Sequence, residues 1–223
     1  MKNVLISYSC GKDSTLALYR MLQQNYKVLG LIVTINKSTQ VSWFHIIPRD
    51  IIQEIADSLN IPVYFVESTG SQNYLETYED TLRKVSIQTN SKICVFGDID
   101  ILEHRTWCID RTNNVGIEAI FPLWQEDRES LTYEFIDAGF EAIIKVVDTN
   151  VLSEDFLGKR LMKEVIEQIK QSGADPCGEN GEYHTIVLNG PIFNKKIDIK
   201  YVDISQYEKY RILNITKNNN YFS

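Results

Sequence analysis

Ser9-Cys10-Gly11-Lys12-Asp13-Ser14 is the stretch of sequence that decides the fold. It follows an apolar run, Val4-Leu5-Ile6, which predicts a buried strand, and it precedes residues 16–22, whose apolar positions have helical spacing. The hexapeptide is therefore predicted to be a loop between a strand and a helix. The first N–H groups of a helix have no partner within the helix and lie at the positive end of its dipole, so such a loop suits an anionic phosphate.

The residue types of this hexapeptide also suit phosphate binding. Gly11 lets the backbone approach a ligand closely, and the hydroxyls of Ser9 and Ser14 can donate to phosphate oxygens. Lys12 supplies positive charge, and the Asp13 carboxylate can hold a divalent ion. The alternative is a polar helix N-terminus with a Ser or Asp cap. Capping residues are common but this dense combination is not, so we favour a phosphate site.

Two well-known phosphate loops do not fit the stretch. A Walker loop needs a glycine five residues before its Gly-Lys pair and Ser or Thr directly after it, whereas this chain has Ile6 and Asp13 at those positions, and no GxGxxG occurs. The stretch resembles the SGGKDS signature of the PP-loop ATP pyrophosphatases, with Cys10 in place of the second residue. The resemblance implies that ATP is cleaved between its α and β phosphates and that the loop binds the leaving pyrophosphate. Cys10 is then a small filler and not a nucleophile.

The composition predicts a soluble globular protein of the cytoplasm. The 223 residues, 43% of them apolar, suffice for one large domain or a domain with an appendage. No apolar run reaches the length of a bilayer-spanning helix, and the N-terminus enters the first strand without a signal-peptide h-region, so no membrane partner is expected. The four cysteines show no CxxC spacing, which favours reduced thiols over disulfides or a zinc site.

The charge pattern disfavours nucleic acid as a partner. The net charge is −7, and the chain has no sustained cluster of Lys and Arg. The sequence does not exclude a local basic groove. Phosphate neutralisation by such residues supplies most of the affinity for nucleic acid. The polar end at 217–220 is predicted to be a frayed terminus.

Short apolar segments alternate with helical patterns through the first half of the chain. Strands are predicted at 28–34, 61–66, 93–96 and 119–121, and helices after Pro48, at 74–87 and at 102–111. This alternation predicts an α/β fold, in which a parallel sheet is flanked by helices on both faces. Ligands of such sheets lie beyond the carboxyl ends of the strands, where the loop at Ser9 and the loop at Gly97-Asp98 are both expected.

The second half of the chain no longer shows the regular alternation of strands and helices. It predicts a helix at 130–138 ended by Gly139, a strand at 141–147, and a long helix capped by Ser153 that runs to 169. A loop rich in Gly, Pro and Asn at 173–181 and strands at 197–202 and 210–213 follow. We therefore expect an ATP-binding domain at 1–124 and a smaller α+β acceptor-binding domain at 125–223.

The loop Cys177-Gly178-Glu179-Asn180-Gly181-Glu182-Tyr183-His184-Thr185 is the second informative stretch. It combines two carboxylates three residues apart, two glycines and a histidine at the edge of a strand, and such a loop can ligate Mg²⁺ or orient a nucleophile. The alternative is a glycine-rich turn with solvated charges. Turns seldom carry both carboxylates and a histidine so densely, so we favour a functional loop.

Further motifs extend the resemblance along the chain. They are Gly97-Asp98-Ile99-Asp100, Glu103-His104-Arg105, Phe121-Pro122-Leu123-Trp124, Gly139-Phe140, Phe156-Leu157-Gly158, the 178–185 loop and Gly190-Pro191-Ile192-Phe193. Together with the hexapeptide they resemble the diphthine-ammonia ligase family, a branch of the PP-loop superfamily with an adenine nucleotide alpha hydrolase-like fold. The resemblance covers most of the chain, from Ser9 to about Phe193. It implies that an ATP-binding domain adenylates a carboxylate, that ammonia displaces AMP to give an amide, and that the Gly-Glu-x-Gly-Glu loop faces the nucleotide.

The resemblance also implies roles for individual residues. The expected nucleotide-binding residues are Ser9, Cys10, Gly11, Lys12, Asp13, Ser14, Gly97 and Asp98. The expected catalytic residues are Lys12, Asp13, Glu179, Glu182 and His184, of which the last three line the acceptor side. The expected cofactors are ATP and Mg²⁺, with Asp13 as a metal ligand.

The acidic loop departs from the family pattern at two positions. Members that complete diphthamide resemble Gly-Glu-Gly-Gly-Glu-aromatic-Glu-Thr, whereas this chain has Asn180 and His184 in place of a Gly and a Glu. The form with Asn and His resembles the bacterial branch, and bacteria do not make diphthamide. The resemblance thus implies the type of reaction and leaves the acceptor open. A histidine in place of an acidic residue also changes which acceptor charge is tolerated.

The roles of two other histidines stay open at this point. His45 follows Trp43-Phe44, and a lone histidine beside aromatic residues more often packs or supports a turn than catalyses. His104 opens a helix after Gly97-Asp98 and can contact the acceptor or phosphate or form part of a solvated charged face. Cys177 could pair with His184 for thiol chemistry, but nothing supplies the third, orienting group.

The sequence as a whole predicts an ATP-dependent, AMP-forming ligase that joins ammonia to a small-molecule or protein carboxylate. The ammonia is expected to come free or from a partner. One alternative is a PP-loop enzyme that modifies tRNA, which would favour a basic surface and paired cysteines. Another is a regulatory module that binds ATP or AMP without turnover, which would not need the acidic loop. The oligomeric state is not fixed by the sequence, and a homodimer stays open.

Overall fold

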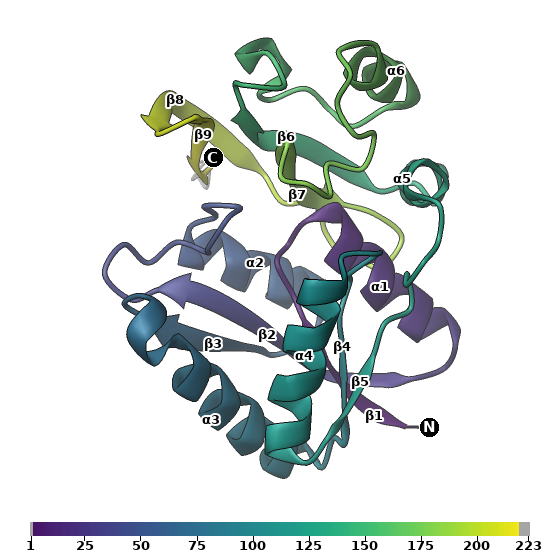
Figure 1. Cartoon of the computed structure of the whole chain (residues 1–223), viewed down its shortest axis with the longest axis vertical. Coiled ribbons are helices and arrows are strands. Elements are labelled where there is room, and N and C mark those ends of the chain that lie inside the picture. Colours follow the sequence, from purple (N-terminus) through teal and green to yellow (C-terminus); the bar gives the residue numbers. More distant parts are fainter. Residues whose placement is uncertain (1, 219–223) are drawn as a thin grey trace, which may run out of the picture.

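The computed structural model describes residues 2–218, apart from the side chains of residues 71–73. Two sheets lie one above the other in Figure 1, the first built from the N-terminal half and the second from the C-terminal half. Of the predicted frayed end, residues 219 and 220 lie outside the described residues, whereas residue 217 still belongs to the last strand. Within the described residues, no helix is both long and apolar enough to cross a membrane.

The first sheet is parallel, and its central strand carries the hexapeptide loop. Its strands are β1 (Asn3–Ser7), β2 (Lys27–Asn36), β3 (Val63–Ser68), β4 (Ile93–Val95) and β5 (Glu118–Ile120). Their order is β3-β2-β1-β4-β5, so the chain first builds outward from β1 on one side and then crosses to the other side. The carboxyl end of β1 is thus the point at which strand order reverses, the usual position for a ligand site in such sheets.

Helices cover both faces of this sheet, as predicted. They are α1 (Lys12–Gln23), α2 (Arg49–Leu59), α3 (Ser71–Thr89) and α4 (Leu102–Val115). Alternate residues of β1 point to opposite faces. Val4 and Ile6 share a buried cluster with residues of α1 and α2, whereas Leu5 shares another with residues of α3 and α4. The predicted α/β class with a parallel sheet is therefore confirmed.

The second sheet is antiparallel and shares its core with the first. Its strands are β6 (Glu141–Asp148), β7 (Tyr183–Asn189), β8 (Ile199–Tyr207) and β9 (Tyr210–Lys217), in the order β7-β6-β9-β8. Helix α5 (Arg128–Asp137) links the sheets, and η1 (Glu154–Phe156) and α6 (Lys163–Gln171) follow β6. Ile144 of β6 and Ile186 of β7 belong to the same buried cluster as Leu18 of α1. The edge strand β7 faces α1 (Figure 1).

The predicted long helix from Ser153 to 169 is wrong. Ser153 caps only the short η1, and α6 begins ten residues later at Lys163. Between them the chain runs along β6, where the Ile144 N–H donates to the Lys159 carbonyl and the Leu161 N–H to the Ala142 carbonyl. Gly158 adopts the left-handed φ of 77°, which interrupts any helix there. Pairing with a strand has overridden a helical spacing of apolar residues.

Candidate functional site

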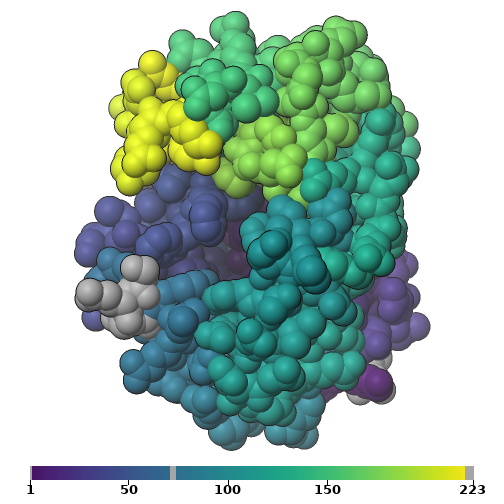
Figure 2. Space-filling model, in the orientation of Figure 1, coloured from purple at the N-terminus to yellow at the C-terminus, as the bar shows by residue number. Residues whose placement is uncertain are grey.

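The hexapeptide loop lies at the floor of a hollow between the two halves of the molecule. Figure 2 shows this hollow with dark purple, N-terminal atoms in its depth, beneath the green atoms of the second half. The indigo segment after β2 and the teal beginning of α4 lie on either side. The hollow therefore opens at the carboxyl edge of the parallel sheet.

Strand β7 holds the backbone of the loop in place. Cys10 has a left-handed φ of 64°, and its carbonyl accepts a hydrogen bond of 2.9 Å from the Val187 N–H. The Lys12 N–H donates to the Thr185 Oγ1 at 3.1 Å, across 173 residues of sequence. The Cys10 side chain is fully buried. The edge of the antiparallel sheet thus supports the back of the hexapeptide loop.

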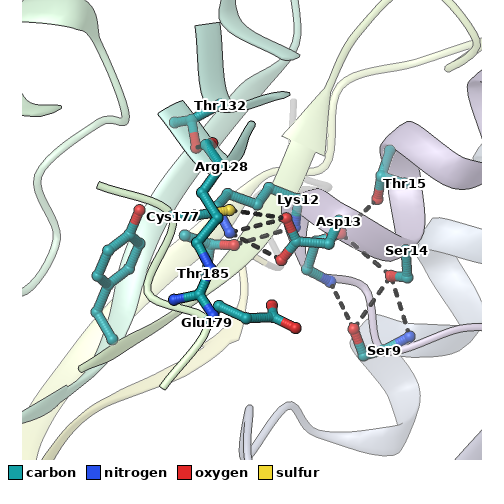
Figure 3. Close-up of polar contacts among 12 residues, drawn as sticks. Ser9, Lys12, Asp13, Ser14, Thr15, Arg128, Thr132, Cys177, Glu179 and Thr185 are labelled. Atoms are coloured by element: carbon teal, nitrogen blue, oxygen red, sulfur yellow. Dashed lines mark hydrogen bonds and ion pairs between the residues drawn. The ribbon is translucent and has the colours of Figure 1, made fainter. Parts of the chain in front are cut away.

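The two serines of the loop are bonded to each other and to the loop backbone. The Ser9 and Ser14 hydroxyls lie 3.1 Å apart, and the Ser14 hydroxyl donates to the Gly11 carbonyl at 3.1 Å. The Gly11 N–H donates to the Ser9 Oγ at 3.3 Å. The Thr15 hydroxyl donates to the same Gly11 carbonyl at 2.8 Å. These contacts preorganise the strand-to-helix turn (Figure 3).

Lys12 and Asp13 form an ion pair at the centre of the site, in which only the Lys12 side chain is buried and that of Asp13 is 30% exposed. The Lys12 Nζ lies 2.9 Å and 2.7 Å from the two Asp13 carboxylate oxygens, and its side chain is only 5% exposed. Burial acts to lower the pKa of Lys12, but the Asp13 carboxylate, with Cys177 and Tyr183, raises it well above its ordinary value. The Cys177 thiol also donates to Asp13 at 3.5 Å. Lys12 therefore remains a cation whose charge is balanced by Asp13.

Gly97 and Asp98 reach the same site from the end of β4. A Cβ atom on Gly97 would lie 2.9 Å from the Asp13 carbonyl carbon and from the Ser14 nitrogen, so the strand end packs directly on the first turn of α1. Burial raises the pKa of Asp98, whose Oδ1 lies 3.8 Å from the His104 Nδ1. The structure accounts for the glycine by this close packing and brings the Asp98 carboxyl beside the loop.

The acidic loop places Glu179 next to the hexapeptide loop. Asp175 fixes the start of this segment, because it is ion-paired with Arg128 and accepts from the Cys177 N–H at 2.8 Å. The Glu179 carboxylate extends toward Ser9 and Asp13 in Figure 3. Burial, followed by the charge of Asp13, raises the pKa of Glu179 to about 7. This carboxyl group is thus poised between its protonated and charged forms at neutral pH.

Glu182 occupies a different position from Glu179. Its carboxylate accepts from the Asn180 N–H and from the Asn180 side-chain amide, both at 3.1 Å, and only 8% of the residue is exposed. Glu182 therefore closes a turn of its own loop. The Asn180 that departs from the family pattern is its hydrogen-bond partner.

The imidazole rings of His184 and His45 lie close together next to the hexapeptide loop. Their ring centroids lie 4.9 Å apart, and the His45 Nδ1 lies 2.7 Å from the Thr185 carbonyl oxygen. A Cβ atom on Gly11 would lie 2.4 Å from the His45 Cε1, so the imidazole packs directly on the loop glycine. Burial lowers the pKa of His45 to about 4 and that of His184 to about 3. Both rings are neutral at physiological pH.

Sequence reasoning did not single out Thr185 or Lys145, and it left the role of His45 undecided. Thr185 bridges the Lys12 backbone and the His45 ring, and Lys145 of β6 is fully buried with its pKa lowered by burial to about 7. Thr185 stands in the quoted acidic loop, but its contacts lie more than a hundred residues away in sequence. The periodicity of apolar residues predicts neither such a long-range contact nor the burial of a lysine.

The site fits a magnesium ion only with the help of a nucleotide. Within the described residues, no three His, Cys, Asp or Glu side chains are grouped so that they alone could hold a metal ion. Mg²⁺ in nucleotide enzymes is commonly bound by one or two carboxylates together with substrate phosphates. Asp13, at the N-terminus of α1, is placed for that arrangement.

Comparisons with known proteins agree with the motifs. A family model described as "Diphthamide synthase N-terminal domain" matches residues 1–119, and one described as "Diphthamide synthase C-terminal domain" matches residues 127–220. Diphthine-ammonia ligase of Schizosaccharomyces pombe is 27% identical over 215 residues, which are 87% of this chain and 35% of the relative. The rat ligase is 24% identical over 216 residues, which are 85% of this chain and 79% of the relative.

The comparisons differ in how much of each protein they cover. The chain spans about a third of the length of the fission yeast relative. A solved structure of a predicted subunit of tRNA methyltransferase from Methanocaldococcus jannaschii aligns with 88% of this chain and all of that chain, at 15% identity and a TM-score of 0.45. The two family models together match nearly the whole sequence, one in each half, and the chain belongs to the diphthamide synthase family.

Proposed function

We propose that the protein is an ATP-dependent ligase that adenylates a carboxylate, releases pyrophosphate, and then joins ammonia to the acyl group with release of AMP. One observation carries this proposal. The hexapeptide loop at the start of α1 is backed by β7, which carries His184, and the His45 imidazole and the Glu179 carboxylate lie beside the same loop. A nucleotide on the loop would thus lie next to a carboxyl group and two imidazoles that could meet an acceptor.

The phosphate side would work mainly by electrostatics. ATP binds at the loop with Ser9, Cys10, Gly11, Lys12, Asp13 and Ser14, beside Gly97 and Asp98. An oxygen of the acceptor carboxylate attacks the α-phosphorus, and the bond from this phosphorus to the bridging oxygen breaks, so that pyrophosphate leaves with the electron pair. The N–H groups of the first turn of α1 beyond Lys12, whose own N–H donates to Thr185, and the Lys12 amine stabilise the charge on the leaving group. Bound at Asp13 and the phosphates, Mg²⁺ would supply Lewis-acid neutralisation of that charge.

ATP must displace Asp13 from the Lys12 amine before a phosphate can bind to that amine. The Lys12 amine is occupied by both carboxylate oxygens of Asp13, so phosphate must compete for it. Mg²⁺ on Asp13 would remove that competition, since the carboxylate would then bind the ion. Metal and nucleotide are therefore expected to bind together, each strengthening the other.

The acceptor side is assigned to the second half of the chain. We propose that residues 1–124 bind ATP and residues 125–223 bind the acceptor, with Glu179 and His184 facing the reacting groups and Glu182 holding the turn that presents them. Diphthine is one candidate acceptor, because the relatives are named for it. Another small-molecule or protein carboxylate is compatible with the same chemistry.

The bond that breaks in ATP tests the proposal. The purified protein is incubated with Mg²⁺-ATP, ammonium chloride, and either a diphthine-bearing protein or a cell metabolite extract, and the nucleotides are separated by chromatography. We expect AMP and pyrophosphate, dependent on the acceptor and lost in Lys12→Ala. ADP as the main product would refute the PP-loop chemistry. AMP that requires added RNA would favour a tRNA-modifying enzyme, and binding without turnover would favour a regulatory module.

A further inference from the structure

His45 is held in place by a strained turn. The residues on either side of it, Phe44 and Ile46, have left-handed φ values of 61° and 53°, although neither is a glycine. The His45 N–H donates to the Trp43 carbonyl at 2.7 Å, and the Ile46 N–H donates to the Ser42 carbonyl at 3.1 Å. Bulky side chains disfavour this conformation, and such strain persists where the surrounding structure fixes it, often at functional sites. The turn points Phe44 outward, 73% exposed, and His45 inward.

The hydrogen bond to Thr185 fixes which nitrogen of His45 carries the proton. A backbone carbonyl oxygen only accepts, so the His45 Nδ1 must donate in the 2.7 Å contact. In a neutral imidazole the other nitrogen, Nε2, then has a free lone pair. Burial lowers the pKa of His45 enough to keep the ring neutral, although the hydrogen bond to Thr185 and the Asp13 carboxylate act in the opposite direction. His45 thus presents a hydrogen-bond acceptor next to Gly11 of the phosphate loop.

His184 adds further unpartnered nitrogens at the same place. The centroid of its ring lies 4.9 Å from the centroid of the His45 ring. Neither His45 Nε2 nor either ring nitrogen of His184 bonds to a described side chain or backbone group. The described polar side-chain atoms that are fully enclosed without a partner are Trp43 Nε1, Arg105 Nε and Arg111 Nε. The three imidazole nitrogens are not among them, so they are not fully enclosed.

We propose that His45 and His184 form the subsite for the incoming nitrogen nucleophile, ammonia or a small primary amine, and hold it through N–H donors to their ring nitrogens. This inference rests on the proposed function and adds His45 to its residues. Lone pairs attract N–H donors and repel a carboxylate, so the pair suits the nucleophile better than the acid group of the acceptor. If ammonia donates two of its own N–H groups to the ring nitrogens, its lone pair stays free to attack the acyl carbon. The new C–N bond forms as the C–O bond to AMP breaks, and one N–H proton passes to water.

Nitrogen NMR of the histidine side chains tests this subsite without any turnover. The chain has only three histidines, and His104, with 57% of its side chain exposed, is an internal reference. Protein with ¹⁵N-labelled histidine and a non-hydrolysable ATP analogue is titrated with ammonium chloride. A parallel titration uses tetramethylammonium chloride, which has the same charge but no N–H donor. We expect saturable shifts of the His45 Nε2 and His184 signals with ammonium alone, and equal small shifts of His104 with both salts.

Two results of this titration would overturn the proposal. One is an identical response of His45 and His184 to both salts, and the other is a proton on the His45 Nε2 at neutral pH. A kinetic comparison adds a second measurement. In His45→Ala the KM for ammonium should rise roughly tenfold, the loss of one or two hydrogen bonds, while ATP–pyrophosphate exchange continues.

The kinetic outcomes separate the subsite from the overall reaction. Loss of exchange together with amide formation, in a variant that folds, would assign His45 to the nucleotide and reject the nitrogen subsite. Absence of exchange in the parent protein with every acceptor would instead reject the proposed ligase. The NMR titration still decides the subsite in that case, because it requires only binding of ammonium.

Discussion

The buried amine of Lys145 makes the stability of the fold depend on pH. The side chain lies in β6 with no exposed surface, and the Nζ donates to the Leu213 carbonyl at 2.9 Å. No carboxylate is paired with it among the described residues. Burial lowers its pKa from 10.5 to about 7. Between these two values the unfolded chain binds a proton that the folded chain does not, so the free energy of unfolding should rise with pH.

The magnitude follows from the two pKa values. At about 1.4 kcal/mol per pH unit between them, the buried amine lowers the free energy of unfolding by about 5 kcal/mol at about pH 6 and by about 2 kcal/mol at about pH 9. Lys145→Met removes this penalty but also removes the hydrogen bond to Leu213, which costs about 1 kcal/mol at either pH. The variant should therefore be more stable than the parent, and its advantage should be about 2 to 3 kcal/mol larger at the lower pH.

Urea unfolding at the two pH values measures this difference. Lys84→Met is the matched control, because Lys84 is exposed on α3 and has no ion pair with any residue that the structure describes. Its change in stability should be nearly the same at both pH values. An advantage of Lys145→Met that does not change with pH would refute the burial of a neutral amine. So would a loss of stability that is larger at about pH 6 than at about pH 9.

Three further predictions test the construction of the site. Thr185→Val should weaken ATP binding about fivefold in calorimetry, because the Lys12 N–H loses its partner, whereas Thr185→Ser should bind like the parent; equal affinity of all three proteins would contradict this role. Gly97→Ala should cost about 1 to 3 kcal/mol in urea unfolding, since its Cβ meets backbone atoms of Asp13 and Ser14, and an unchanged midpoint would show that β4 and α1 are not in close contact. The folded protein should resist iodoacetamide, because each cysteine is at most 5% exposed and burial raises the pKa of Cys94 and Cys177 to about 12; rapid labelling seen by mass spectrometry would refute this burial.

The sequence alone determined the parallel sheet and the place of its ligand loop. Apolar runs of strand length alternate with helical spacing, and these local periodicities depend only on which side chains must face the core. The hexapeptide falls between the first strand and helix, so its position at the carboxyl end of β1 followed from the chain order. Motifs quoted from both halves of the chain indicated the family to which it belongs.

Local pattern was less informative where strands pair across the chain. The apolar spacing after Ser153 indicates a helix, yet residues 158–161 pair with β6 through backbone hydrogen bonds. Glu179 and Glu182 look equivalent in sequence, but one reaches the phosphate loop and the other bonds to Asn180. Which way a loop side chain turns depends on what packs above it, and no spacing within the loop encodes that.

Only the tertiary structure decided how the two halves make one site. Thr185 and Val187 support the phosphate loop from β7, and His45 covers Gly11 through a hydrogen bond that spans 140 residues. The burial of Lys145 arises in the same way, from the packing of one sheet on another. Each contact joins segments that are brought together by chain crossing, and the pattern of residues along one segment carries no signal of its distant partner. The loop could therefore be identified from its own residues. The residues of β7 that support it, and the imidazoles beside it, could be identified only from the folded structure.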